Sequence, residues 1–366
     1  MATGYAPSSM YRSREGMGIW EHRGKVAAVG VGHSPTERRW DEKPETSVGA
    51  WSIMALRNAI ADAGVSPDQV DGIVIVPETT TGAFWPEDKP LPQDVINAFV
   101  QTDDPLDGIA KLSVEWLLKN MPELTNIKYS VYAPVCMSNA LNVAAQVVGD
   151  GLAHTVLVLK AWHNLQGRYY QGGQNAQDAI GGTSAIRSLW GAPACYGTAL
   201  QFAEYCRKYG KDHDMMTPFI INSRRNGLMF PEGYWAQHRP EELTPEDYQL
   251  ARWIAKPANL FDNDIPIMCA ASYLFTTAER AKDMKQKPLY VLVHVHASHP
   301  SKSTMATLED HEQWTDSLAR RLYEAAGASG PDDLDVFNPY DGFATFTQTY
   351  FCLLYTSPSP RDATLS

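Results

Sequence analysis

Short apolar segments alternate along the chain with longer segments whose apolar residues recur at helical spacing. The short segments predict buried strands: Val26–Gly32, Val70–Val76, Ile127–Tyr132, Thr155–Lys160 and Ala270–Thr276. The longer segments predict helices: Ser47–Ala63, Leu106–Leu118, Asn139–Val148 and Ala278 to about Met284. Alternating strands and helices with short connections predict an α/β fold with a mainly parallel sheet that is covered on both faces.

Two segments interrupt this alternation. Pro77–Pro105 is rich in proline and acidic residues, and it is predicted to be a surface excursion. The region from about Ala161 to Asp264 contains paired glycines, many aromatic residues and helical rather than strand patterns. We expect the second region to be an insertion that caps the edge of the sheet, where substrate-binding surface is common.

One helix–turn–strand pattern occurs twice. Trp51–Val76 and Trp314–Phe343 each begin with tryptophan, run as a helix to an Ala-Gly pair, and continue through Pro-Asp into an apolar segment. The tryptophans precede Gly64 and Gly327 by the same number of residues. A repeat of one such unit predicts two halves built alike. The alternative is that two unrelated units share common turn chemistry.

The repeat extends to the strand before each helix. Val26–Gly32 has its counterpart in Tyr290–His296. We therefore expect these two strands to occupy equivalent central positions in two packed sheets. The predicted halves are residues 25–284, which include the insertion at 161–264, and residues 285–354.

The ends of the chain differ from the body. Residues 1–24 contain charges and no apolar stretch, so they are predicted to be a leader segment rather than a secretory signal. Residues 355–366 (YTSPSPRDATLS) are broken by prolines, and they are expected to be a foreign tail. If so, the second half is expected to be truncated.

Composition narrows the class of protein. A length of 366 residues favours two packed lobes. The net charge of −11 argues against a nucleic-acid surface. The 5 cysteines are odd in number and irregularly spaced, which suits free thiols in a reducing, cytoplasmic location. No apolar run reaches the roughly 18 residues that a membrane span needs.

Five motifs, taken in order, carry a family resemblance: KVAAVGVGHSPTER, AIADAGVSPDQVDGIV, AQVVGDGLAHTVLVL, DIPIMCAASYLFTTAERA and DLDVFNPYDGF. From Lys25 to about Phe351 the chain resembles the thiolase superfamily. It is most similar to the thiolase-like lipid-transfer branch, which is related to sterol-carrier-protein-type thiolases and steroid side-chain aldolases. The resemblance implies a five-layered α/β fold of two duplicated halves. It also implies a homodimer, with or without an accessory acyl-CoA-binding subunit, that acts on acyl-CoA thioesters.

Cys136 is the first candidate catalytic residue. It lies in VCMSN at a predicted strand-to-helix junction, where a helix N-terminus stabilises a thiolate. Thiolases place their acyl-accepting cysteine at this junction. The count from Cys136 to the AQVVGDG segment, however, is about two residues short of the family pattern, and the nucleophile position then falls near Pro134. The alternative is a small buried thiol near the site.

The corner Tyr340–Phe343 is the second candidate. Thiolases carry an Asn-Glu or His-Asp pair here that shapes the oxyanion site. The phenol of Tyr340 can donate a hydrogen bond to an enolate oxygen or exchange a proton. Asp341 is expected either to orient it or to cap the following helix. Gly342 allows close approach of the backbone. The alternative is a tyrosine at the rim of the core.

Substrate-binding candidates come from the insertion and from the second copy of the strand. Arg168, Arg224 and Arg225 suit phosphates, because guanidinium groups donate two hydrogen bonds at once. The alternative is a solvated helix face. Tyr290 and His294 are expected to line the cleft.

Three other patterns are not assigned to ligands. The spacing of His294, His296 and His299 favours a strand with polar residues rather than a metal site, and no metal is predicted. Asp262 and Asp264 are expected to be turn residues or to tie the cap to the core. Gly30 and Gly32 lack the third glycine of a dinucleotide-binding loop.

These features favour an enzyme that makes or breaks a C–C bond beside an acyl-CoA thioester. Retro-aldol cleavage of a 3-hydroxyacyl-CoA with a lipid or steroid side chain is preferred, with Tyr340 steadying or protonating the enolate. This reaction needs no acyl-cysteine and no cofactor beyond the coenzyme A of the substrate. The alternatives are a true thiolase that uses Cys136, and a non-catalytic acyl-CoA or sterol carrier or scaffold subunit.

Overall fold

The structure is a computed structural model, and it describes residues 18–76, 85, 89–133, 136–162, 196–295 and 307–351. The chain divides into two compact units. The first comprises Met1–Tyr169 and Pro266–His296, and the second comprises Tyr170–Ile265 and Ala297–Ser366. The predicted insertion at 161–264 thus corresponds closely to the first segment of the second unit. The predicted foreign tail, residues 355–366, lies outside the described residues.

The first unit contains a sheet in the order β3-β2-β4-β7-β1-β8. Its strands are β1 (Val26–His33), β2 (Gly72–Ile75), β3 (Tyr129–Tyr132), β4 (Thr155–Trp162), β7 (Cys269–Thr277) and β8 (Leu289–Tyr290). Strand β2 pairs in parallel with β3 and β4, and both β4 and β1 are antiparallel to β7. Four strands therefore share one direction, as predicted, and β7 and β8 oppose them.

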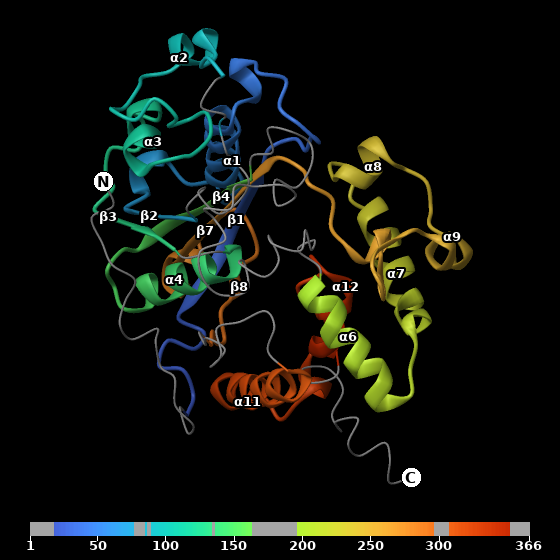
Figure 1. The fold of residues 1–366 in the computed structure, drawn as a ribbon. Helices are drawn as coiled ribbons and strands as arrows, with labels where there is room; N and C mark the ends of the chain where they lie inside the picture. Colours follow the sequence, from blue (N-terminus) through green and yellow to red (C-terminus); the bar gives the residue numbers. More distant parts are fainter. Residues whose placement is uncertain are drawn as a thin grey trace. The chain divides into compact units, whose positions relative to one another are not determined.

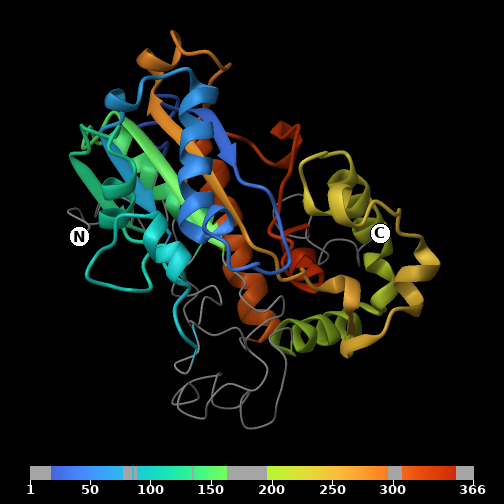
Figure 2. The same ribbon diagram turned by 90° about the horizontal axis from the view of Figure 1, so that it is seen from above.

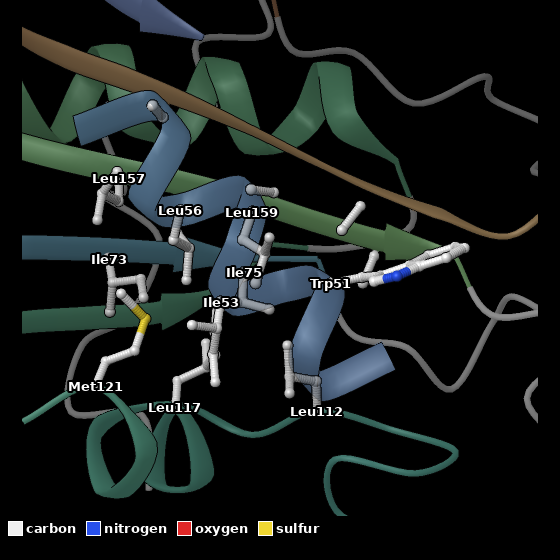
Figure 3. Close-up of a cluster of buried hydrophobic side chains, with 14 of the residues drawn as sticks. Trp51, Ile53, Leu56, Ile73, Ile75, Leu112, Leu117, Met121, Leu157 and Leu159 are labelled. Atoms are coloured by element: carbon white, nitrogen blue, oxygen red, sulfur yellow. The ribbon is translucent and has the colours of Figure 1, made fainter. Parts of the chain in front are cut away.

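Helices cover both faces of this sheet. Helices α1 (Val48–Ala63) and α3 (Val114–Asn120) lie on one face, and α4 (Met137–Gly149) lies on the other (Figure 1). Successive residues of a strand point to opposite faces. Ile73 and Ile75 accordingly pack into the core beneath α1 and α3, as Figure 3 shows, while Val74 packs beneath α4.

Two glycines allow α1 to lie close against β1. A β-carbon on Gly30 would overlap the backbone of Ala59, and one on Gly32 would overlap the backbone of Ala55. Helix α1 lies lengthwise along the strands (Figure 2), so both glycines meet the same helix. The glycines thus serve helix–sheet packing, in agreement with the prediction that they do not belong to a nucleotide-binding loop.

The repeated helix and turn have the same local geometry. Helix α1 ends at Gly64 with φ 71° and ψ 27°, and α11 (Leu308–Ala326) ends at Gly327 with φ 68° and ψ 29°. Only glycine adopts this left-handed conformation without cost. A 3₁₀ turn follows each, at Pro67–Gln69 and at Pro331–Asp333. The predicted repeat is confirmed up to this turn.

The repeat does not extend to the strands. Within the described residues 307–351 no strand follows the second turn. The prediction that Val26–Gly32 and Tyr290–His296 occupy two separate sheets is wrong for the described residues. Instead β8 pairs antiparallel with Ala27 and Ala28 of β1 in the same sheet. This pairing satisfies backbone groups that the edge of β1 would otherwise expose.

The described part of the second unit is mainly helical, as predicted for the insertion. It contains α6 (Tyr196–Tyr209), α7 (Thr217–Leu228), α8 (Tyr234–His238), α9 (Pro245–Leu250), α11 and α12 (Ala344–Tyr350). A hairpin of β5 (Trp253–Ala255) and β6 (Ala258–Asn259) was not predicted. The hydrophobic core of the second unit includes Phe202, Ile220 and Tyr248.

Two other helix predictions need adjustment, and one short helix was not predicted. Helix α3 begins at Val114 and not at Leu106, because Gly108 has a φ of 82° that breaks a helix. A short helix, α2 (Gln93–Ala98), lies in the predicted surface excursion, and α10 (Ala278–Ala281) is shorter than expected.

In the described part of the chain, no helix combines the length and the apolar character that crossing a membrane requires.

Candidate functional site

The carboxyl ends of β2, β3 and β4 and the first turn of α4 lie at one edge of the first unit's sheet. Cys136 is the N-cap of α4, with an extended backbone (φ −141°, ψ 164°), and its side chain is half-buried. Its Sγ lies 3.0 Å from Oγ of Ser138. The predicted strand-to-helix junction is therefore confirmed, and the nucleophilic role of Cys136 stays a prediction.

On the face of the sheet that carries α4, burial at the carboxyl ends of the strands differs from strand to strand. Along β7, Ala270, Ser272 and Leu274 point toward α1 and are fully buried. Cys269 and Ala271 alternate with them, point to the α4 face, and are only partly buried. On this face the carboxyl ends of β2 and β3 are covered, since Val76 is 2% and Ala133 0% exposed, whereas the neighbouring residues of β7 are only partly buried.

Two basic residues flank the partly buried Ala271. In the sheet register, Ala271 of β7 lies opposite His33 of β1 on one side and Lys160 of β4 on the other. All three side chains therefore share the α4 face. The Lys160 ammonium lies 4.5 Å from the ring centre of Trp162, which is two residues further along the same face.

Sequence analysis overlooked Lys160, although a signal for it is present. It is the one charged residue in the strand TVLVLKAW, in which Val156 to Leu159 are fully buried. A lysine that continues a buried strand at its carboxyl end is unusual enough to examine, because a charged group in a core is costly unless it meets water or an anion.

Tyr290 and His294 lie near the opposite edge of the sheet. Tyr290 pairs with Ala27 near the amino end of β1. His294 Nε2 lies 2.8 Å from Oε1 of Gln146, in the carboxyl half of α4, and the same oxygen accepts a hydrogen bond of 3.2 Å from Nε1 of Trp20. Their substrate-binding role stays a prediction, and the contacts they make in the first unit are structural.

The Tyr340–Phe343 corner belongs to the second unit. Tyr340 is 56% exposed, and its ring folds back over Gly342. The corner is held from both sides. The carbonyl of Gly342 accepts a hydrogen bond from the amide of Asp264 (3.1 Å), and that of Tyr340 accepts one from Oγ1 of Thr347 (2.8 Å). The backbone amide of Asp264 thus joins the insertion to this corner, and a role for its side chain stays a prediction.

Asp341 does not cap the helix that follows. The N-cap of α12 is Phe343, so the alternative that Asp341 caps this helix is wrong. The surrounding protein partly desolvates the carboxyl of Asp341 and raises its pKa above the ordinary value of 3.8. A raised pKa brings a carboxyl nearer to proton exchange at neutral pH, which suits a catalytic residue.

The arginines of the insertion have different surroundings. The guanidinium of Arg224 stacks 3.7 Å from the ring centre of Trp235, and its Nη1 donates to the carbonyl of Glu241 (3.2 Å). Burial lowers the pKa of Arg224. Arg225 is exposed, and Arg168 lies outside the described residues. Phosphate binding by these arginines stays a prediction.

A buried polar cluster in the second unit links elements that are distant in sequence. Asp262 accepts hydrogen bonds from Nε2 of His213 (2.7 Å), from the hydroxyl of Tyr248 (2.7 Å) and from the amide of Asn259 (2.6 Å). The ring of His213 stacks on that of Tyr248. Burial, reinforced by the charge of Asp262, raises the pKa of Tyr248 and keeps the phenol neutral. Asp262 therefore ties together the elements of the second unit.

Comparisons with known proteins give relatives along most of the chain. The chain is 24% identical over 335 residues to 17-hydroxy-3-oxo-4-pregnene-20-carboxyl-CoA lyase of Mycobacterium tuberculosis, covering 88% of this chain and 77% of the relative. It is 23% identical over 329 residues to the steroid side-chain-cleaving aldolase of Thermomonospora curvata, covering 87% and 75%. No protein-family model matches the chain.

Solved structures share the fold. The Ltp2-ChsH2(DUF35) aldolase superposes with a TM-score of 0.70 at 20% identity, covering 91% of this chain and 77% of that chain. The chain therefore has the thiolase fold. Two further structures extend the likeness of fold: acetyl-CoA acetyltransferase from Syntrophomonas wolfei (TM-score 0.57, 15% identity, covering 91% and 83%) and human mitochondrial 3-ketoacyl-CoA thiolase (0.56, 12%, covering 91% and 83%).

The predicted resemblance to thiolase-like proteins and the predicted α/β fold are thereby confirmed. Cys136 belongs to the first unit and the Tyr340–Gly342 corner to the second. Sequence analysis missed His213 and Tyr248, which are recognisable only once the fold places them beside Asp262.

Proposed function

We propose that this thiolase-fold protein is an acyl-CoA C–C lyase that cleaves a 3-hydroxyacyl-CoA by a retro-aldol reaction. The observation that carries the proposal is the match to two curated enzymes, one named a carboxyl-CoA lyase and the other a side-chain-cleaving aldolase, over 87–88% of the chain. The predicted aldolase-type activity agrees with both names.

The chemistry needs one proton acceptor and one group that stabilises negative charge. A base removes the proton of the β-hydroxyl, the Cα–Cβ bond breaks, and the β-carbon leaves as a ketone or aldehyde. The bonding electrons pass into the thioester and form an enolate, which is then protonated at Cα. Tyr340 is the proposed donor to the enolate oxygen, and Asp341, whose pKa is raised by desolvation, is the proposed partner in proton exchange.

The proposed substrate is an acyl-CoA with a steroid or similar lipid side chain. The Mycobacterium tuberculosis relative is named for a 17-hydroxy steroid joined to coenzyme A. The name of the similar solved structure pairs Ltp2 with ChsH2(DUF35), which supports an accessory subunit. Coenzyme A would enter as part of the substrate, and no further cofactor is proposed. The protein is proposed to act as a homodimer, on the strength of the family resemblance.

The test is direct. The purified protein, alone and with a candidate accessory subunit, is incubated with a 17-hydroxy steroid 20-carboxyl-CoA, and the products are separated by mass. We expect the shortened acyl-CoA and the ketosteroid to appear in equal amounts. Saturable binding of this thioester without either product would contradict the lyase and favour the carrier.

One observation favours a second candidate, a true thiolase. Cys136 occupies the N-cap position of α4, and its sulfur lies 3.0 Å from the hydroxyl oxygen of Ser138. Incubation with acetyl-CoA and a 3-ketoacyl-CoA, followed by intact-protein mass measurement, would reveal an acyl group on Cys136. Thiolysis that depends on this acyl-enzyme would replace the aldolase proposal.

A further inference from the structure

The last segment of the first unit, Leu289–His294, has a weak hold on its sheet. Strand β8 is two residues long, and its register joins it to two residues of β1. Leu289 and Leu292 are 72% and 46% exposed, and Val291 and Val293 are only partly buried. A segment that buries so little apolar surface opens readily unless other contacts hold it. The segment therefore depends on support from outside its own pairing.

Residues Gly18–Gly24, here called the strap, supply backbone support. They precede β1 and lie within the predicted leader segment. The amide of Gly24 donates to the carbonyl of Val291 (2.9 Å), and the amide of Val291 donates to the carbonyl of Val26 (2.9 Å). Gly24 has a φ of 71°, a left-handed conformation that glycine adopts without cost. The strap thus adds a backbone hydrogen bond beyond the end of β8.

Trp20 joins the strap to both α4 and the strand segment. Its indole is 2% exposed, and its Nε1 donates to Oε1 of Gln146 (3.2 Å). The indole meets the ring of His294 edge-on, with the ring centres 5.1 Å apart. The same Oε1 of Gln146, which is fully buried, lies 2.8 Å from Nε2 of His294. One amide oxygen of α4 therefore holds the strap and the end of the segment together.

His22 gives the strap a second anchor, at the carboxyl end of α4. Its Nε2 lies 2.8 Å from Oδ1 of Asp150, and this oxygen also accepts a hydrogen bond from Nε2 of Gln146 (2.9 Å). Gly149 leaves the space for the imidazole, because a β-carbon there would overlap the ring. The strap is therefore fastened to α4 at two places.

We propose that the strap is a latch: while it is seated it keeps Leu289–His294 on the sheet, and its removal releases this segment. The first unit ends at His296 and the chain continues into the second unit at Ala297, so the latch also fixes where the chain leaves the first unit. Release would uncover the edge of β1, whose backbone groups are then available to another strand. The latch is independent of the proposed reaction, and it is tested without substrate.

The first test is hydrogen exchange of the full chain, read at the amide of Val291 and at the amides of β2, an interior strand of the same sheet. We expect Trp20→Ala to speed exchange at Val291 by about 10²-fold, because the indole, its hydrogen bond and its contact with His294 are lost together. The amides of β2 should stay strongly protected. Exchange at Val291 as slow as in the parent would overturn the inference.

Two further variants make this test specific to the latch. Trp20→Phe keeps an aromatic ring and removes the indole donor, so we expect exchange at Val291 to rise by about tenfold. Ile19→Ala shortens a side chain of the strap that is 62% exposed, and it should change the exchange rate by less than about threefold. Loss of protection at β2 together with Val291 in Trp20→Phe would show that the sheet opens as one body, and would overturn the latch.

The second test is chymotrypsin cleavage after Tyr290, identified by the masses of the fragments. The backbone must leave the sheet to enter a protease, so the cleavage rate follows the population of the open segment. We expect cleavage at this bond to be about 10²-fold faster in Trp20→Ala than in the parent and unchanged in Ile19→Ala. If circular dichroism shows that Trp20→Ala has lost its fold, Trp20→Phe decides, with an expected rise of about tenfold. Equal cleavage rates in the Trp20 and Ile19 variants would overturn the inference.

Discussion

The ring of Tyr340 lies so close over Gly342 that a β-carbon at position 342 would overlap the phenol hydroxyl. The glycine therefore sets where the hydroxyl stands. If that hydroxyl donates to the enolate, Tyr340→Phe should lower kcat by about 10²–10³, the scale of one oxyanion donor, and change KM little. Steady-state kinetics on the 3-hydroxyacyl-CoA makes this measurement.

Gly342→Ala provides the matched control, because it moves the ring and keeps the hydroxyl. We expect it to lower kcat as well, and we expect the double variant with Tyr340→Phe to be no worse than Tyr340→Phe alone. Such non-additivity is typical of two changes that act on one interaction. Full turnover in Tyr340→Phe would eliminate the proposed role of the phenol.

The raised pKa of Asp341 predicts a pH effect on stability. In the folded protein the carboxyl holds its proton to a higher pH than the ordinary 3.8 of an unfolded chain. Between these two pKa values the folded state binds more protons, so the free energy of unfolding should decrease as pH rises through this window. Asp341→Asn should remove that decrease. Urea unfolding at a series of pH values tests this, and an unchanged slope in the variant would contradict it.

Cys136 is predicted to lie near the reaction without being indispensable. Retro-aldol cleavage forms no acyl-enzyme, so Cys136→Ala should retain a measurable share of turnover. Cys206→Ala is a suitable control, because this second half-buried thiol lies in α6 of the second unit. Complete loss of turnover in Cys136→Ala alone, with an acyl group trapped on the parent's cysteine, would establish the thiolase instead.

Sequence patterning predicts the first unit well because its signals are local. Strand β1 and helix α1 agree with their predicted bounds to within one residue, since alternation, the Ser47 cap and Gly64 all lie inside the segment. Helix α3 was misplaced because Ser113, whose hydroxyl accepts from the amide of Trp116, was not recognised as its cap. That signal was present in the sequence.

Other features depend on contacts between distant residues, which patterning does not reveal. Asp262 looked like a turn residue, and only the fold brings His213, 49 positions away, onto its carboxylate. The pairing of β8 with β1 likewise joins residues with no common local signal. The strand register places Lys160 opposite Ala271, and the sequence alone does not reveal this pairing.

Gly32 is predicted to be intolerant of any side chain. A β-carbon there would overlap the backbone of Ala55 and approach that of Ala59, so α1 would have to move away from the sheet. We expect Gly32→Ala to lower the free energy of unfolding by about 1–3 kcal/mol, the usual cost of overpacking. Gly330→Ala is the control, because its surroundings are open. Urea unfolding compares the two, and equal stability of the variants would contradict the close packing of α1 on β1.

The buried cluster around Asp262 should be the most sensitive point of the second unit. Asp262 is 1% exposed, and Asp262→Ala would remove the carboxylate that accepts from the His213 imidazole, the Tyr248 hydroxyl and the amide of Asn259. Removing one member of such a buried network costs about 3–5 kcal/mol, whereas Tyr248→Phe removes one neutral donor and should cost about 1 kcal/mol. Asp214 is an exposed carboxylate one residue from His213, so Asp214→Ala should leave the free energy of unfolding almost unchanged.

Trp253 packs edge-on against the His213 ring, with the ring centres 4.8 Å apart, so its fluorescence during urea unfolding reports on this cluster. Similar unfolding midpoints for Asp262→Ala and Asp214→Ala would show that the cluster does not hold the unit together.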